Sequence, residues 1–176
     1  DLLAQGVEIY NLSVTHLRDN FLLGDPDRSF RLAAYTTMAA ARSRHRRLAP
    51  VGGSDSHSDH LRATTWVLAT ERSERGVHDA IVHGRTCVKS PEACSLEVRD
   101  VTSPTWIGVG GTLHGASRIQ ARAEGAEMSL YKGGELVARA PAGTVAEVTL
   151  ERDRCAVLWA RVGEGISAPI YANCAF

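Results

Sequence analysis

The second half of the chain alternates apolar and polar residues, and this period of two restricts its fold more than any other feature. Segments such as SRIQARAE, ELVARAP and CAVLWARV show the alternation, and short stretches such as KGG, APAG and ERDR separate several of them. Alternation places the apolar side chains on one face of a strand. Short strands at this spacing are typical of a small β-sandwich. We therefore expect residues 103–176 to form an all-β, sandwich-like domain without a helix longer than three turns.

The first half, residues 1–102, alternates strand-like and helix-like segments. VEIYN, APVGG, TTWVLAT, RTCVKS and CSLEVRD are predicted strands or short apolar runs. One predicted helix follows an Asp25 cap with Pro26 at its first position, and a second runs from a Ser73 cap to Gly84. The order β-α-β-β-α-β predicts an α/β unit. The expected fold class is α/β followed by all-β, joined by the linker VTSPTW.

Composition and charge exclude several classes of protein. The 176 residues are 44% hydrophobic and 23% charged, which is ordinary for a globular chain. Twenty Lys and Arg balance twenty Asp and Glu, so we expect no nucleic-acid partner. The basic cluster RSRHRR suits the C-terminal end of the first predicted helix. No apolar run reaches transmembrane length and no signal peptide is visible, so we expect a soluble protein without a membrane partner. The compartment stays open.

The segment VGGSDSHSDH places Asp55, His57, Asp59 and His60 within six positions. In an extended segment, Asp55 and His57 leave the same face because they are two residues apart. A carboxylate and an imidazole form a usable ligand pair for Zn, Mn or Fe. The segment follows a predicted strand, and α/β barrels build their sites at the C-terminal ends of strands. The alternative is a polar turn in which Asp55 forms an Asx-turn.

The order of several motifs resembles the C-terminal part of a PHP domain, the polymerase and histidinol phosphatase family of metal-dependent phosphoesterases. The motifs are GSDSH, then ATTWVLA, then ERSERGVHDAIVHGRTCVKSPEACSLEVR, with VEIYN upstream. They cover residues 7–100. The β-rich half is similar to the domain that follows the barrel in some members, including carbaryl-hydrolase-like ones, and PIYANCAF is similar to their terminal strand.

The resemblance implies a distorted (β/α)7 barrel that holds two or three divalent metals, Mn, Fe or Zn. Asp55 and His57 would be two of the metal ligands, about 2.0–2.3 Å from the metal. Bound metals would hold the phosphate and activate a water for in-line attack. The family also needs an early H-x-H motif, and this sequence has none. We therefore expect a fragment whose remaining ligands come from a missing N-terminal barrel segment. A chain without an initiator methionine suggests the same.

Other polar residues near the motif are candidates for roles at the site. Asp59 and His60 support the ligands from behind or lie in solvent, and the remaining alternative is that they bind the metal directly. His16 follows the VEIYN strand, where it either faces the site or lies on a surface loop. Asn11 ends that strand and could support the site through a hydrogen bond. Arg62 either meets a substrate anion or is an ordinary surface residue. The sequence identifies no catalytic residue.

The remaining histidines, tryptophans and cysteines have structural interpretations. His78 and His83 lie in the second predicted helix, and we expect them to be structural or exposed. Trp66 and Trp159 lie in predicted strands, where we expect core positions. Cys87, Cys94, Cys155 and Cys174 show no CxxC spacing. An even count permits disulfides, but without a visible export signal we expect free thiols.

Three functions follow as alternatives. The default is a phosphoesterase fragment of the PHP type acting on a small-molecule phosphoester. A carboxylester or carbamate substrate is the variant suggested by the β-rich half. The third alternative is a non-catalytic binding or scaffold module. An H-x-H motif encoded immediately upstream would favour the hydrolase, whereas a start codon at this point would favour the scaffold.

Overall fold

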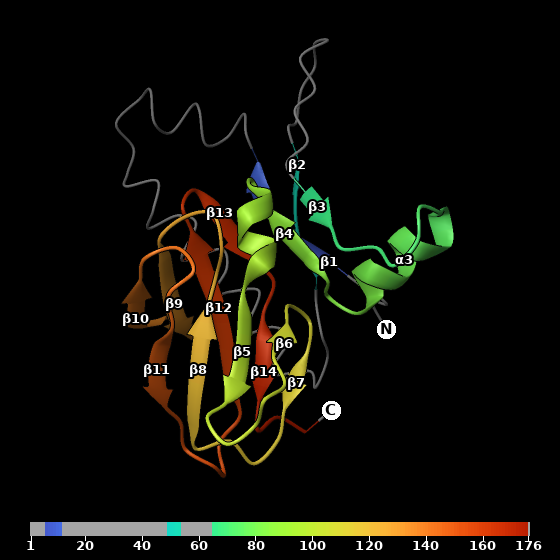
Figure 1. Cartoon of the computed structure of the whole chain (residues 1–176). Helices are drawn as coiled ribbons and strands as arrows, with labels where there is room; N and C mark the ends of the chain where they lie inside the picture. Colours follow the sequence, from blue (N-terminus) through green and yellow to red (C-terminus); the bar gives the residue numbers. More distant parts are fainter. Residues whose placement is uncertain (1–5, 12–48, 54–64, 176) are drawn as a thin grey trace.

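The computed structural model describes residues 6–11, 49–53 and 65–175, and most of the regular secondary structure among them is β-strand (Figure 1). The strands form three sheets, called A, B and C here. The described helices are α3, Glu74–Val82, and the 3-10 helix η1, Pro91–Ser95. Within the described ranges, no helix has the length and apolarity needed to cross a bilayer.

Sheet A is a parallel pair made from the start of the chain. Strand β1 is Gly6–Asn11 and strand β2 is Ala49–Gly53. Gly6 pairs with Ala49, and Asn11 pairs with Gly53, so the two strands end together. Parallel strands need a crossover connection, and the helix predicted between these two strands lies outside the described residues. The seven-stranded barrel itself stays a prediction.

Sheets B and C form the β-rich body of the molecule. Sheet B has the order β10-β9-β12-β13-β4-β3, with β14 paired to β12 and β7 paired to β14. Its strands are β3 Thr65–Val67, β4 Thr86–Val88, β7 Thr112–Leu113, β9 Met128–Lys132, β10 Glu135–Ala140, β12 Ala156–Val162, β13 Gly165–Ser167 and β14 Ile170–Ala172. Sheet C has the order β11-β8-β5-β6. Its strands are β5 Glu97–Asp100, β6 Ile107–Gly108, β8 Arg118–Arg122 and β11 Ala146–Thr149.

The main core lies between sheets B and C, and the alternation in the sequence builds it. In β8, Ile119 and Ala121 are fully buried, whereas Arg118 is exposed on the outer face. In β12, Leu158 and Ala160 enter the same core from the opposite sheet. Residues 103–175 contain no helix, so the prediction of an all-β second half is confirmed for the described part of the chain.

A second buried cluster lies on the face of sheet B that points away from sheet C. Tyr131 and Trp159 stack there with their ring centroids 4.3 Å apart, and Tyr171 is 1% exposed. The indole N–H of Trp159 donates to the carbonyl oxygen of Gly133 at 2.7 Å. The core position expected for Trp159 is confirmed. The core position expected for Trp66 is wrong: its side chain is 42% exposed because β3 is the last strand of sheet B.

The helix α3 begins and ends as the sequence predicts. The Ser73 hydroxyl oxygen accepts a hydrogen bond from the backbone N–H of Gly76, which is the expected cap. Gly84 has a φ of +66°, the left-handed conformation that favours glycine after a helix. A Cβ on Gly110 would overlap the carbonyl oxygen of His83. The end of α3 therefore packs directly against the backbone between β6 and β7.

Both larger sheets combine strands from the two sides of the predicted boundary at residue 103. In sheet B, β4 pairs with β13, and Val88 lies opposite Ile166. In sheet C, β5 pairs with β8, and Val98 lies opposite Ala121. Residues 65–100 are thus hydrogen-bonded into the β-rich body. The placing of the domain boundary stays a prediction.

All four cysteines are paired, so the expectation of free thiols is wrong. Cys87 is bonded to Cys94, and Cys155 is bonded to Cys174. The second pair is set by the sheet, because β12 and β14 are neighbours and Ala156 lies opposite Ala172. The Cα atoms are 5.2 Å apart in the first pair and 4.3 Å apart in the second. The prediction failed because the fold, which no export signal reports, brings each pair together: η1 carries Cys94 back to β4, and β14 pairs with β12.

Asn173 fastens the end of the chain to two turns of the β-rich body. Its side-chain oxygen accepts from the N–H of Ala116 at 2.9 Å, and its amide group donates to the carbonyl oxygens of Ala116 at 2.7 Å and Glu151 at 3.1 Å. The residue has a φ of 58°, which asparagine tolerates better than most side chains. The side chain adds these bonds to the backbone hydrogen bond from Asn173 N–H to the carbonyl oxygen of Leu113 at 2.9 Å.

We predict that Asn173→Ala lowers the free energy of unfolding by about 2–4 kcal/mol, because three hydrogen bonds are lost and alanine is strained at positive φ. Asn173→Gly removes the same bonds without the strain, so it should lose about 1 kcal/mol less. Urea denaturation followed by tryptophan fluorescence measures both variants. Wild-type stability of the alanine variant would contradict the role given to this side chain.

Candidate functional site

The carboxyl ends of β1 and β2 form the candidate site, because the D-x-H segment follows β2 directly. Asn11 is the last residue of β1 and lies in register with Gly53, the last residue of β2. Asp55 comes two residues later. Parallel strands present their carboxyl ends at one edge, and open α/β sheets and barrels use this edge for ligands. The register therefore brings the end of the VEIYN strand to the start of the D-x-H segment.

Thr65 joins the strand before this segment to the strand after it. Its hydroxyl oxygen accepts from the N–H of Gly52 at 2.8 Å, and its hydroxyl group donates to the carbonyl oxygen of Gly52 at 2.7 Å. The two bonds satisfy both polar groups of one backbone residue with one side chain. The end of β2 and the start of β3 are thus held next to each other.

A second threonine holds β2 against sheet B. The Thr86 hydroxyl is fully buried and donates to the carbonyl oxygen of Pro50 at 2.8 Å. Thr86 and Val88 lie on the same face of β4, because they are two residues apart. Val88 belongs to the aromatic cluster of sheet B, so β2 lies on the side of the sheet away from sheet C. Two hydroxyl groups, rather than a strand ladder, thus join β2 to the strands of sheet B.

The sequence-predicted ligands fall outside the described part of the chain. These residues are Asp55, His57, Asp59, His60, Arg62 and His16. The common face and the metal distances expected for Asp55 and His57 therefore stay predictions. Asn11 is described as the end of β1, at the edge from which the D-x-H segment starts. Thr65 and Thr86 were missed, because no local pattern shows that their hydroxyl groups reach β2.

The described histidines do not form a metal site. No group of three His, Cys, Asp or Glu side chains within residues 6–11, 49–53 and 65–175 could hold a metal ion. His83 is exposed, and its Nδ1 lies 3.1 Å from the carboxylate of Asp79, which also pairs with Arg85. His78 and His114 are exposed as well. The expectation that His78 and His83 are structural or exposed is confirmed.

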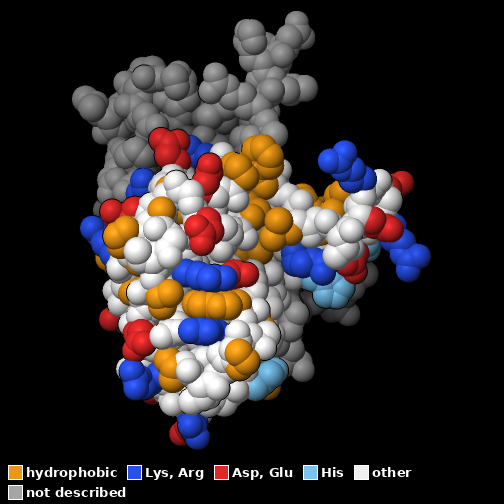
Figure 2. Space-filling model, viewed as in Figure 1, with side chains coloured by type: hydrophobic (Ala, Val, Ile, Leu, Met, Phe, Trp, Pro, Cys, Tyr) orange, Lys and Arg blue, Asp and Glu red, His pale blue; other side chains and the backbone are white. Residues whose placement is uncertain are grey.

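The outer face of sheet C carries a ladder of paired side chains that the sequence did not predict. Trp106 lies between two guanidinium groups, with Arg99 at 4.6 Å and Arg122 at 4.2 Å from the ring centroid. Arg122 also donates to the carboxylate of Glu97 at 2.7 Å. Figure 2 shows basic, acidic and apolar side chains side by side on this face. Both faces of the indole are covered, so this ladder fastens the linker to the sheet and offers no ring for a ligand.

The ladder continues to β11 through Glu147. The carboxylate of Glu147 accepts from Gln120 and Arg118 at 2.8 Å each. The hydrogen bond from Gln120, followed by that from Arg118, lowers the pKa of Glu147 below its ordinary value. The carboxylate of Glu147 is solvent-exposed, so its hydrogen bonds with Gln120 and Arg118 form a surface network.

An open hollow lies between β3 and α3. Its floor is apolar, from Val67, Ala69 and Val77, and its rim contains Glu71 and Arg72. The rim is solvent-exposed, and the Ser73 hydroxyl at its side is already bonded to Glu71 at 2.6 Å and to Gly76. The hollow therefore lacks the convergent buried polar groups of a ligand site.

Comparisons with protein-family models, with curated proteins and with solved structures found no match to this chain.

We predict that Thr65→Val loosens the end of β2, because both hydrogen bonds to Gly52 are lost. The free energy of unfolding should fall by about 1–2 kcal/mol, and the amide hydrogen of Gly52 should exchange faster. Thr65→Ser retains the hydroxyl group and should keep the slow exchange. Thr149→Val is the control on an exposed strand position. Hydrogen exchange followed by NMR measures the effect, and equal rates in wild type and Thr65→Val would refute it.

Proposed function

We propose that this chain carries the late metal-ligand pair of a PHP-type metal-dependent hydrolase, with a small-molecule phosphoester as the default substrate. The observation that supports the proposal is the register of sheet A. Asn11 and Gly53 end two parallel strands side by side, and the sequence Gly-Ser-Asp-Ser-His continues from that edge. This is where an α/β barrel places its ligands.

In this proposal, Asp55 and His57 bind divalent Mn, Fe or Zn ions, two or three in the complete site. Carboxylate and imidazole suit these metals. Metals of this kind supply a nucleophilic water and neutralise the charge of a phosphoester. The chain's own contribution is to hold the two side chains at a fixed edge. The Thr65 and Thr86 hydroxyl groups serve this purpose by fastening β2 at Gly52 and at Pro50.

The neighbouring polar residues have supporting roles. Asn11 would orient a ligand or a water through a hydrogen bond. Arg62 would pair with the substrate anion, since a guanidinium group binds phosphate in a bidentate manner. Asp59, His60 and His16 would support the ligands from behind or complete the coordination. The remaining ligands come from the barrel segment that this sequence does not contain.

Carboxylester or carbamate hydrolysis is the variant of the same proposal, since the same metal-bound water attacks either carbonyl or phosphoryl centres. The non-catalytic alternative rests on a different observation. Most of the described chain is a two-sheet body with a paired, charged outer face. Such a body could serve as a scaffold.

We predict that the isolated 176-residue chain binds Mn²⁺ weakly and hydrolyses an aryl phosphate little or not at all. Two ligands leave most coordination positions to water, so a bound water is poorly positioned for attack. Adding the missing barrel segment should restore tight binding. Asp55→Ala or His57→Ala should then reduce metal affinity by at least about 10–100-fold.

The matched control is His114→Ala, because His114 is exposed on the β-rich body and no role is assigned to it. This variant should bind metal as the wild type does. Robust turnover by the isolated chain that needs His57 would contradict the fragment proposal. Binding that survives both Asp55→Ala and His57→Ala would contradict the ligand assignment itself.

A further inference from the structure

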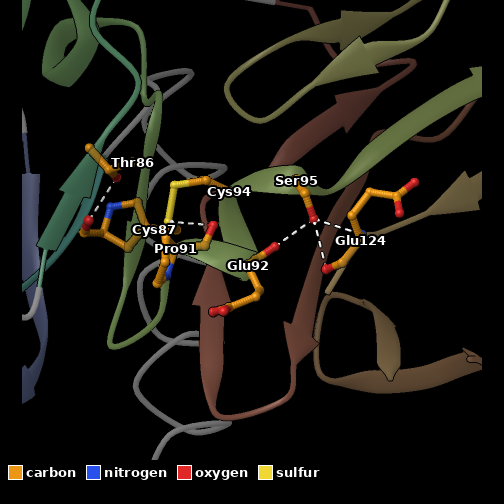
Figure 3. Close-up of a disulfide and its surroundings, with 8 residues drawn as sticks. Thr86, Cys87, Pro91, Glu92, Cys94, Ser95 and Glu124 are labelled. Carbon is orange, nitrogen blue, oxygen red and sulfur yellow. Dashed lines mark hydrogen bonds between the residues drawn. A yellow bond between two sulfur atoms is a disulfide. The ribbon is translucent and has the colours of Figure 1, made fainter. Parts of the chain in front are cut away.

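The short helix η1 is fastened to the β-rich body at several points, and one of them is the Cys87–Cys94 disulfide (Figure 3). The hydroxyl group of Ser95 donates to the carbonyl oxygen of Glu92 at 2.6 Å. The hydroxyl oxygen of Ser95 accepts from the N–H of Glu124 at 2.8 Å, in the turn after β8. A Cβ on Gly125 would lie 2.6 Å from the side chain of Glu92. These contacts fix η1 to sheet C.

The same helix is also packed closely against sheet B. A Cβ on Gly165, in β13, would lie 2.8 Å from Cβ of Ala93 and 2.9 Å from the carbonyl oxygen of Ser90. Only a glycine fits there, so η1 and β13 cannot separate or slide without breaking a tight contact. The position of η1 is thus determined without the disulfide.

Strand β4 connects this fixed helix to the candidate site. Successive residues of a strand point to opposite faces, so Cys87 and Thr86 leave β4 on opposite sides. Cys87 joins the core between the sheets and is bonded to Cys94 of η1. Thr86 reaches β2 at Pro50 on the other side. The Cys87–Cys94 bond therefore acts on a strand whose side chains contact both η1 and β2.

We propose that the Cys87–Cys94 disulfide is a thiol–disulfide exchange site that controls how firmly β4 holds β2. When it is intact, β4 is bonded covalently to η1 and Thr86 holds Pro50 in a fixed place. When it is reduced, β4 keeps only its strand pairing, and β2 with its carboxyl edge becomes looser. The proposal goes beyond the proposed function and does not depend on the identity of the metal or the substrate.

The exchange proceeds with a dithiol reductant as the co-reactant. Cys94 is partly exposed, whereas Cys87 has no exposed surface, so the incoming thiolate attacks Sγ of Cys94. The Cys87–Cys94 bond breaks, and its electron pair passes to Sγ of Cys87, which takes a proton. The second thiol of the reductant then attacks the mixed disulfide and releases Cys94 as a thiol. The products are two protein thiols and one oxidised dithiol.

After reduction, the thiol of Cys87 has a hydrogen-bond acceptor nearby. The carbonyl oxygen of Pro91 lies 3.9 Å from Sγ of Cys87, where it can accept a weak hydrogen bond from a thiol. The buried sulfur is therefore not left among apolar groups alone.

The second disulfide differs and provides a matched control. Cys155 and Cys174 are separated by 19 residues in the sequence, whereas Cys87 and Cys94 are separated by 7. The second bond joins β12 to the end of β14, two strands that are already paired. Opening the shorter loop releases less chain entropy, so the body should stay folded when Cys87–Cys94 is reduced.

The test compares amide hydrogen exchange in four samples of the full chain: oxidised wild type, dithiol-treated wild type, Cys87→Ser/Cys94→Ser, and Cys155→Ser/Cys174→Ser. We expect exchange in β2 and β3 to rise by about tenfold in the treated wild type and in Cys87→Ser/Cys94→Ser. Exchange in β12 should stay slow in both. The Cys155→Ser/Cys174→Ser variant should leave β2 and β3 unchanged.

Unchanged exchange in β2 and β3 after loss of Cys87–Cys94 would overturn the proposal. So would loss of slow exchange in β12 in the treated wild type and in Cys87→Ser/Cys94→Ser alike, because the bond would then be a condition of folding. Titration of the same samples with Mn²⁺, which prefers oxygen and nitrogen ligands to thiolates, tests the proposed function separately. A chain that shows the exchange effect but binds Mn²⁺ equally well after Asp55→Ala and His57→Ala contradicts the proposed function and leaves the redox control standing.

Discussion

The position of β4 is the constraint on which the rest of the structure depends. Its backbone pairs with β3 on one side and with β13 on the other, so it joins the edge of sheet B to the centre. Its side chains reach η1 on one face and β2 on the opposite face. Three residues thus connect the parallel pair that carries the candidate site to the core between sheets B and C. Besides its pairing with β1, β2 is held to the described structure by Thr86 of β4 and Thr65 of β3.

The elements that were predicted from the sequence depend on local chemistry. The cap at Ser73 and the glycine after α3 act within one turn, and the alternation in β8 follows from the geometry of a strand. The predictions that failed depend on neighbours distant in sequence. Trp66 is exposed because its strand is at an edge, and Cys155 and Cys174 are paired because β12 and β14 are adjacent. No short sequence pattern predicts which strands become neighbours in a sheet.

The candidate site also has features that the local sequence predicts and features that depend on residues distant in sequence. The D-x-H spacing and the preceding glycine pair identify the segment from sequence, and the register of Asn11 with Gly53 is consistent with that interpretation. The two threonine hydroxyl groups that hold β2 could not be predicted, because Thr86 and Pro50 are 36 residues apart. The guanidinium groups around Trp106 were also missed, since they come from β5 and β8 and meet only after the sheet has formed.

Sheets B and C each contain strands from before and after residue 103, and this limits the points at which the chain can be divided into independent pieces. A piece that begins at residue 103 would lack β3, β4 and β5, so β13 and β8 would each present a bare edge. Unpaired edges of this kind invite association with other chains. Recombination that transferred only the β-rich part from residue 103 onward would leave the same two strand edges unpaired. The recombination unit that keeps every described strand of the body paired must start upstream of Thr65.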